Sequence, residues 1–234
     1  MTTSASDEVL SRLTTALERA QKEESLELEI RIGQYRDGTF TSGVTRSHMD
    51  RIVQALNAND AVCPTNPNMK WEEVEDFFFT DASSRRLRTR VSFDNDRMCM
   101  SSTTIQKQLI DQFIIRTHAL DARISLAAEL AVDNVPHAVK PTFVRIKQVR
   151  QYNLKTSPFV IDCSAVWSGS KRSHAEKKQS EEDGVFELEC EYLPDKTNCD
   201  KYPTTKEGRN RLAKSFLYKI ADIMLSTKVH FEMA

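Results

Sequence analysis

The sequence lacks the patterns that mark disulfide-stabilised, zinc-binding and membrane proteins. Its 234 residues include five cysteines and five histidines, all scattered and without metal-site spacing, so we expect reduced thiols and no zinc centre. Neither a transmembrane run nor a signal-peptide core is found, which predicts a soluble, intracellular protein without a membrane partner. The formal net charge is -1, so any anionic substrate has to be attracted by a local basic patch.

Three motifs of phosphate and hydrolase chemistry are also absent. No G-x-x-x-x-G-K loop occurs, so the chain is not a P-loop enzyme. Cys190 lies in a strand-like segment and Cys199 has no arginine at the Cys-x5-Arg spacing, which excludes a cysteine-dependent phosphatase. No serine nucleophile elbow is present either.

What the chain does have is acidic residues at alternate positions in two segments, 26–32 and 186–192. Alternate side chains of a β-strand share a face. The charged residues that share a face in these segments are Glu27, Glu29 and Arg31, and Glu187, Glu189 and Glu191. Like charges on one sheet face are destabilising, so such a cluster needs a use, and carboxylate oxygens suit Mg²⁺ or Mn²⁺. One such strand alone could be the solvated side of a half-buried sheet, whereas two together favour a metal site.

Several segments between the acidic ones carry basic residues in alternation. These residues are Arg86, Arg88 and Arg90, then Lys107 on a less regular segment, Arg123 with Glu129, and finally Arg145 with Lys147. Each strand alone could be a solvated sheet face. If the strands close into a barrel with their apolar faces outward, however, acids would bind metal and bases would hold phosphate oxygens inside it. This combination suits a phosphohydrolase that acts on a polyphosphate end.

The hydrophobic pattern predicts a mainly β (α+β) fold in a single domain over residues 1–234. Helices are predicted at 7–23, 47–57 and 205–227, and strands at 26–33, 39–44, 72–80, 85–93, 97–107, 109–117, 121–131, 142–152, 158–166 and 185–192. Short connections favour antiparallel pairing, and so many strands favour a barrel over an open sheet. The charge-rich stretch 168–184 is predicted to be a mobile loop, and 59–70 is also predicted to be a loop.

These motifs resemble those of the metal-dependent RNA 5′-triphosphatases of mRNA capping, the fungal, protozoan and viral type of triphosphate tunnel metalloenzyme. The resemblance covers about residues 26–192 and rests chiefly on the two strands with alternating glutamates. Supporting segments are TFTSGV at 39–44, RVSFD at 90–94, RISLAAE at 123–129, RIK at 145–147 and IDCSAV at 161–166. The resemblance implies a closed eight-stranded antiparallel β-barrel, the triphosphate tunnel, with flanking helices at both termini. It also implies removal of the γ-phosphate from 5′-triphosphate RNA.

The same resemblance implies roles for individual residues. Glu27, Glu29 and Glu191 should bind the Mg²⁺ or Mn²⁺ ion. The residues expected in catalysis are Glu189 and Glu129, which should position water, together with Arg90 and Lys107. The residues expected to hold phosphate are Arg90, Lys107, Arg145, Lys147, Arg150, Arg123 and Arg31, with Glu187 and Asp162 as supporting acids.

Segment 142–152 departs from the family pattern of alternating basic residues. Val149 takes the third basic position, and Arg150 lies out of phase. A β-bulge at Gln148 and Val149 would turn Arg150 into the tunnel, whereas without a bulge it would point outward. The expected phosphate contact of Arg150 depends on that bulge.

Several alternatives stay open at this point. Another tunnel enzyme could act on inorganic or thiamine triphosphate or as a class IV adenylyl cyclase, although those usually carry lysine where this chain has Arg31. A non-catalytic module that binds polyphosphate or RNA would need the bases but not the full carboxylate set. A barrel held by internal salt bridges is a poor explanation, because buried ion pairs seldom add net stability.

The resemblance also implies partners and a location. The expected substrates are 5′-triphosphate RNA and, with manganese, free nucleoside triphosphates. A guanylyltransferase would use the product. The expected location is nuclear, or cytoplasmic for a viral protein. The sequence leaves the oligomeric state open.

Overall fold

The structure, a computed structural model, describes residues 5–66, 70–81, 83–93, 98–116, 120–133, 140–155, 157–193, 203 and 205–225. Cys199, residue 94 of the RVSFD segment, and residues 97, 117, 226 and 227 of the predicted elements lie outside these ranges. The helices are α1 (Ala5–Lys22), α2 (Arg46–Asn57), α3 (Arg172–Glu181) and α4 (Lys206–Leu225). The strands are β1 (Leu26–Arg36), β2 (Thr39–Ser42), β3 (Val62–Pro64), β4 (Glu72–Thr80), β5 (Arg86–Phe93), β6 (Cys99–Ile115), β7 (Asp121–Ala131), β8 (Phe143–Leu154), β9 (Phe159–Gly169) and β10 (Val185–Tyr192).

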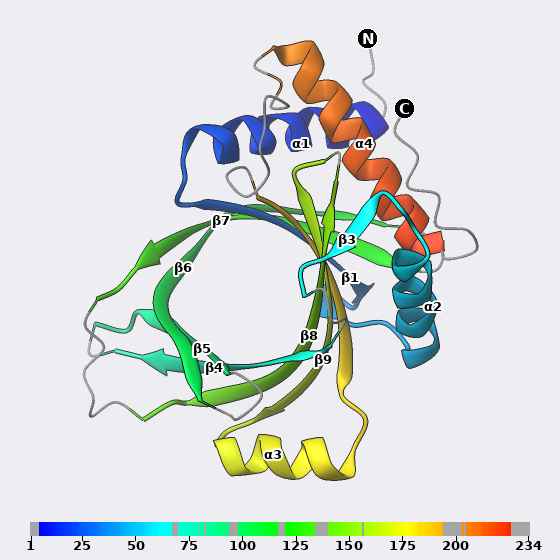
Figure 1. The fold of residues 1–234 in the computed structure, drawn as a ribbon. Coiled ribbons are helices and arrows are strands. Elements are labelled where there is room, and N and C mark those ends of the chain that lie inside the picture. Colours follow the sequence, from blue (N-terminus) through cyan, green and yellow to red (C-terminus); the bar gives the residue numbers. More distant parts are fainter. Residues whose placement is uncertain are drawn as a thin grey trace.

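Eight of these strands close into an antiparallel barrel (Figure 1). Their order is β10-β9-β8-β4-β5-β6-β7-β1, and β1 pairs back onto β10 with Glu29 opposite Glu191. The short strands β2 and β3 pair with β1 and β8 at the margin of the barrel. The predicted closed, eight-stranded antiparallel barrel is therefore confirmed.

The hydrophobic core lies between the outer face of the barrel and the helices. Leu28 and Ile30 of β1 are fully buried there, because their alternation with Glu27 and Glu29 sends apolar side chains outward. Leu13 of α1 belongs to the same cluster, and Phe216 of α4 stacks on Phe159 of β9 at 3.9 Å between ring centroids. Figure 1 shows α1 and α4 side by side against one side of the barrel. The opposite faces of the same strands are thus left for polar residues.

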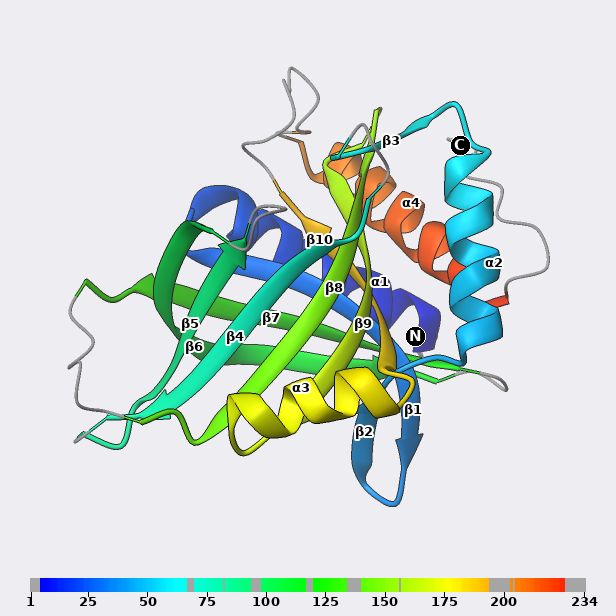
Figure 2. The same cartoon turned by 60° about the horizontal axis from the view of Figure 1, so that its bottom comes forward.

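The stretch predicted as a mobile loop, 168–184, instead contains helix α3. This helix packs against β8 and β9 (Figure 2). Arg172 makes a bidentate ion pair with the buried Glu75 of β4, and two i,i+4 pairs, Arg172–Glu176 and Lys177–Glu181, support the helix. The prediction was wrong because low hydrophobicity does not reveal a helix that is attached by charge and a single buried Ala175.

Two predicted strands, 97–107 and 109–117, form the single 17-residue strand β6. Its register against β7 shifts between Leu109 and Asp111, which marks a bulge. The bulge shifts the alternation of β6 by one residue, so the irregular pattern around Lys107 reflected a bulge and not a turn. Among the described helices, none is long and apolar enough to cross a membrane.

Candidate active site in the barrel tunnel

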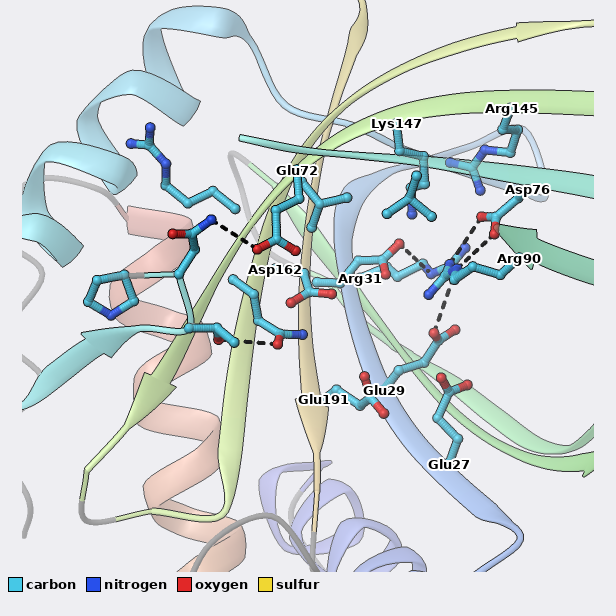
Figure 3. Close-up of a pocket in the computed structure, with 18 of the residues that line it drawn as sticks. Glu27, Glu29, Arg31, Glu72, Asp76, Arg90, Arg145, Lys147, Asp162 and Glu191 are labelled. Atoms are coloured by element: carbon cyan, nitrogen blue, oxygen red, sulfur yellow. Dashed lines mark hydrogen bonds and ion pairs between the residues drawn. The ribbon is translucent and has the colours of Figure 1, made fainter. Parts of the chain in front are cut away.

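A polar cavity runs inside the barrel, and most of the predicted site residues line it (Figure 3). The lining residues that the sequence predicted are Glu27, Glu29, Arg31, Arg90, Lys107, Arg123, Arg145, Lys147, Arg150, Asp162, Glu189 and Glu191. Two further predicted residues contact this set: Glu187 pairs with Arg145, and Glu129 pairs with Arg88 at 3.1 Å. The barrel therefore brings together residues that are more than 150 positions apart in the sequence.

Glu27, Glu29 and Glu191 form an acidic cluster where β1 meets β10. Glu29 is 6% exposed and lies opposite Glu191, and Glu27 follows on the same face of β1. Burial, and then the charge of Glu29, raise the pKa of Glu27 to about 7. Burial, and then the charge of Glu27, raise the pKa of Glu191 to about 8. The three carboxylates of the cluster have two cations within ion-pair distance in the described part of the chain, Lys107 and Arg31.

Lys107 is the cation closest to this cluster. Its ammonium group donates to Glu27 and, at 3.3 Å, to Glu29, and it lies 3.6 Å from Glu129. Burial lowers the pKa of Lys107, but the charges of Glu29 and Glu27 outweigh burial and raise it overall. Among the described residues, no group of three or more acids, histidines or cysteines lies close enough together to hold a metal ion. The ammonium group of Lys107 therefore bridges the carboxylates of Glu27 and Glu29.

Glu189 has a different environment from the acidic cluster. Its burial raises its pKa, but Arg31, Lys147 and Arg145 outweigh that effect and hold the pKa far below the usual range. Arg31 bridges Glu189 and Glu29, with a distance of 3.2 Å to each. The buried Oε1 atom of Glu189 accepts no hydrogen bond within the described part of the chain. Glu189 is therefore an ionised carboxylate that can accept a hydrogen bond from a water molecule.

The opposite wall of the cavity is basic. Arg90 of β5 and Arg145 and Lys147 of β8 point toward the same space, facing the carboxylates of Glu27, Glu29 and Glu191 (Figure 3). The guanidinium of Arg145 and the ammonium of Lys147, at 4.0 Å, share Glu187. Asp162 lies beside Glu189 on the neighbouring strand, and burial followed by the charge of Glu189 raises its pKa to about 6.

Asp76 is a site residue that the sequence did not reveal. It is 1% exposed, and its two oxygens accept from Arg90 Nε at 2.8 Å and from another guanidinium nitrogen at 3.0 Å. Burial would raise its pKa, but the hydrogen bond and charge of Arg90 lower it. The segment EEVEDFFFT offers four acids, and only the strand register, which sets Asp76 opposite both Arg90 and Arg145, selects this one.

Arg150 lies at the margin of the basic wall. β8 pairs with both neighbours without a register shift at Gln148 or Val149, so the predicted bulge is absent. Arg150 consequently lies opposite the fully buried Cys163 of the outer core. It nevertheless lines the cavity, where its guanidinium lies over the ring of Trp71, 4.9 Å from the ring centroid. The predicted bulge is therefore wrong, whereas the phosphate contact of Arg150 stays a prediction.

Comparison with known proteins agrees with this architecture. A family model described as mRNA capping enzyme, beta chain, matches residues 33–220, and β1 with Glu27 and Glu29 lies largely outside the match. A comparison with curated proteins finds no match to the sequence.

Solved structures with a similar fold include RNA triphosphatases. The S. pombe Pct1 RNA triphosphatase is 16% identical, with a TM-score of 0.67 over 98% of this chain and 95% of that chain. The RNA triphosphatase domain of the mimivirus mRNA capping enzyme is 11% identical, with a TM-score of 0.57 over 96% and 99%. The fold is thus that of the tunnel triphosphatases, and the chain belongs to the family of the mRNA capping enzyme beta chain.

Proposed function

We propose that this protein is a metal-dependent RNA 5′-triphosphatase that removes the γ-phosphate of 5′-triphosphate RNA in the first step of capping. The observation that carries the proposal is an under-neutralised acidic cluster facing a basic wall inside one closed barrel. Hydrolysis of a triphosphate needs cations to neutralise the transferred group and a group that orients water. Membership of the capping family supports an RNA end as the substrate.

Glu27, Glu29 and Glu191 would hold one Mg²⁺ or Mn²⁺ ion, since both prefer carboxylate oxygens. When bound, the ion neutralises charge on the γ-phosphate and polarises it toward attack. The raised pKa values of Glu27 and Glu191, which come from burial and then from neighbouring acids, support this proposal, because a bound cation would favour the ionised carboxylates. Lys107 has to leave its bridging position, and Glu129, already 3.6 Å away, offers it another partner.

The chain's own residues supply the remaining functions. Arg90, Arg145 and Lys147 bind oxygens of the triphosphate, with arginine donating in pairs and lysine acting as a point charge. Asp76 fixes the orientation of Arg90 through two hydrogen bonds. The ionised Glu189 accepts a hydrogen bond from the attacking water and orients it, beside Arg31 Nε, which lies 3.2 Å from its Oε1 atom.

The partners and location follow from the proposed reaction. The diphosphate end that remains is the substrate of a guanylyltransferase, which makes that enzyme the expected partner. One Pct1 structure is a complex with the Spt5 CTD, so a peptide partner on the barrel exterior is an additional proposal for this chain. Capping takes place on nascent transcripts, which favours a nuclear location for a cellular protein. Hydrolysis of nucleoside triphosphates with Mn²⁺ is expected as a side activity.

The test is phosphate release from 5′-triphosphate RNA with no metal, with Mg²⁺ and with Mn²⁺. We expect metal-dependent release of the γ-phosphate alone, and its loss by a factor of ~100 or more in Glu29→Gln and Glu191→Gln. Glu23→Gln is the matched control, because Glu23 is exposed and lies outside the cavity. It should retain full activity.

Other outcomes identify the alternatives. Hydrolysis of inorganic triphosphate without use of RNA would keep the tunnel chemistry and reject the capping substrate. RNA binding without turnover under any metal would reject the enzyme and favour a binding module.

A further inference from the structure

The cavity in the barrel has two halves that differ in charge. They share Glu29, Arg31, Arg88 and Arg145, so they are continuous. The residues that line only the half with the acidic cluster include six acids and four cations. The residues that line only the other half include three cations, Arg86, Lys107 and Arg123, and no acid. A polyanion is therefore attracted into the tunnel from one side.

We name the far end of this second half the basic mouth and define it by Phe78, Arg86, Leu109, Gln112 and Arg123. The opposite mouth has Pro64, Thr65, Asn66, Lys70 and Glu72, whose charges cancel. Asn66 of that mouth also donates to Glu72 at 3.2 Å, so part of its polar surface is already satisfied.

The two arginines of the basic mouth lack the carboxylate partners that the deeper arginines have. Arg88 pairs with Glu129 at 3.1 Å, and Arg145 pairs with Glu187. Among the described residues, neither Arg86 nor Arg123 has an ion-pair partner within 4.0 Å, and the buried Nε atom of Arg123 has no hydrogen-bond partner. The ring of Phe40 lies 4.9 Å from the Arg123 guanidinium and fixes its position. Both cations are available to an anion.

Apolar side chains accompany these cations. Leu109 is 58% exposed although it lines the cavity, and Phe78, whose ring lies 5.7 Å from that of Phe143, lines the same half of the cavity. The inorganic triphosphate group is polar throughout and does not gain binding energy from apolar contacts. A nucleobase and its ribose gain binding energy from such contacts, because a base offers a flat apolar face to an aromatic or aliphatic side chain.

We infer that the basic mouth binds the first nucleotides of single-stranded RNA. The 5′-nucleoside lies against Phe78 and Leu109, and the following phosphodiesters pair with Arg86 and Arg123. The triphosphate then points inward to Arg90 and the acidic cluster. This inference rests on the proposed function and deepens it, because it assigns the residues that distinguish an RNA end from a free triphosphate.

The experiment compares inorganic triphosphate, a nucleoside triphosphate, and 5′-triphosphate RNAs of two and five nucleotides. For the wild type, kcat/KM should rise with RNA length. Arg86→Gln should remove that rise, with a fall of ~10-fold on the five-nucleotide RNA, and weaken its dependence on salt by about one phosphate contact. Hydrolysis of inorganic triphosphate should be unchanged, because Arg86 is not among the residues proposed to hold the triphosphate.

Lys70→Gln at the opposite mouth is the matched control and should behave as wild type on all four substrates. An equal loss of kcat/KM on inorganic triphosphate and on RNA in the Arg86→Gln variant would overturn the inference while leaving the proposed function intact. If the rise of kcat/KM with RNA length were lost in Lys70→Gln instead, RNA would be assigned to the opposite mouth, and the inference would also be overturned. A wild type that hydrolyses none of the four substrates would overturn the proposed function itself.

Discussion

Buried acids on β4 and buried acids on β1 and β10 are neutralised in different ways. On β4, Glu75 and Asp76 point to opposite faces of the barrel, both are 1% exposed, and each has an arginine with paired hydrogen bonds. On β1 and β10, Glu27 and Glu29 share the ammonium group of Lys107, Arg31 is divided between Glu29 and Glu189, and the pKa of Glu191 is raised to about 8.

This difference distinguishes buried acids that stabilise the fold through their own ion pairs from buried acids that are suited to binding a ligand. An acid with its own arginine fixes that arginine and needs no further charge. Acids that outnumber their cations cost free energy unless a ligand supplies the missing charge. Glu75 pairs with Arg172 of α3 and Asp76 pairs with Arg90, whereas the acidic cluster is the proposed site of a divalent cation.

The largest expected effect comes from Glu189→Gln, which keeps the shape of the residue and removes the negative charge that orients the attacking water. We expect kcat on 5′-triphosphate RNA to fall by ~10²–10³-fold, the usual cost of removing one preorganised hydrogen-bonding group. The measurement is single-turnover phosphate release at saturating RNA. A fall of less than threefold would remove Glu189 from its proposed role.

Asp76→Asn should have the next largest effect. It leaves Arg90 without a charged partner, so the guanidinium loses its fixed orientation, and we expect kcat/KM to fall by ~10–100-fold. Glu75→Gln, one residue away on the outer face, is the control and should keep kcat/KM within about twofold of the wild type while it lowers thermal stability. Equal effects of the two variants on activity would show that Asp76 acts only on stability.

Arg172→Gln should affect stability alone. It leaves Glu75 buried without its ion pair, at a cost of about 1–3 kcal/mol. For a chain of this length, that corresponds to a fall in Tm of roughly 2–4 °C per kcal/mol. Thermal unfolding and steady-state kinetics on the same preparation test this. Unchanged Tm would mean that the ion pair does not hold α3.

The smallest expected effect is a pH dependence of stability. Because burial raises the folded-state pKa of Glu191 from its usual 4.5 to about 8, its contribution to stability is present below pH 4.5 and is lost as pH rises through 8. Glu27, with a pKa of about 7, acts in the same direction. Without metal, Tm should therefore fall between pH 5 and 8 by roughly a few °C.

Added Mn²⁺ should reduce this fall, because the cation stabilises the ionised carboxylates. Glu191→Gln should make the pH dependence shallower without metal and should respond less to Mn²⁺. A Tm that rises from pH 5 to 8 would contradict the assignment of the acidic cluster.

The barrel and its acidic strands were predicted mainly from the alternation of polar and apolar residues along each strand. Glu27, Glu29, Glu189 and Glu191 could be assigned to one face, because period-2 patterns report the face directly. Asp76 could not be assigned in this way, because its segment carries acids on both faces and only the pairing with β5 decides between them.

The errors have equally local causes. Within 168–184, residues 172–181 form a helix that is joined to the barrel by long-range contacts such as the ion pair with Glu75, which no local pattern encodes. Register shifts occur on β6 near Leu109 and on β5 between Ser92 and Phe93, whereas the sequence suggested a bulge on β8 at Val149. Bulge positions depend on how two strands match in register, which a single strand does not record.

Pairing of β1 with β10 has a consequence for which molecules can react. Once these strands are hydrogen-bonded, the wall is continuous, and no strand edge is available through which a chain could enter sideways. A circular RNA has no free end to insert while the barrel stays closed. A substrate therefore has to enter through a mouth of the barrel with one end first, independently of any contact with a base.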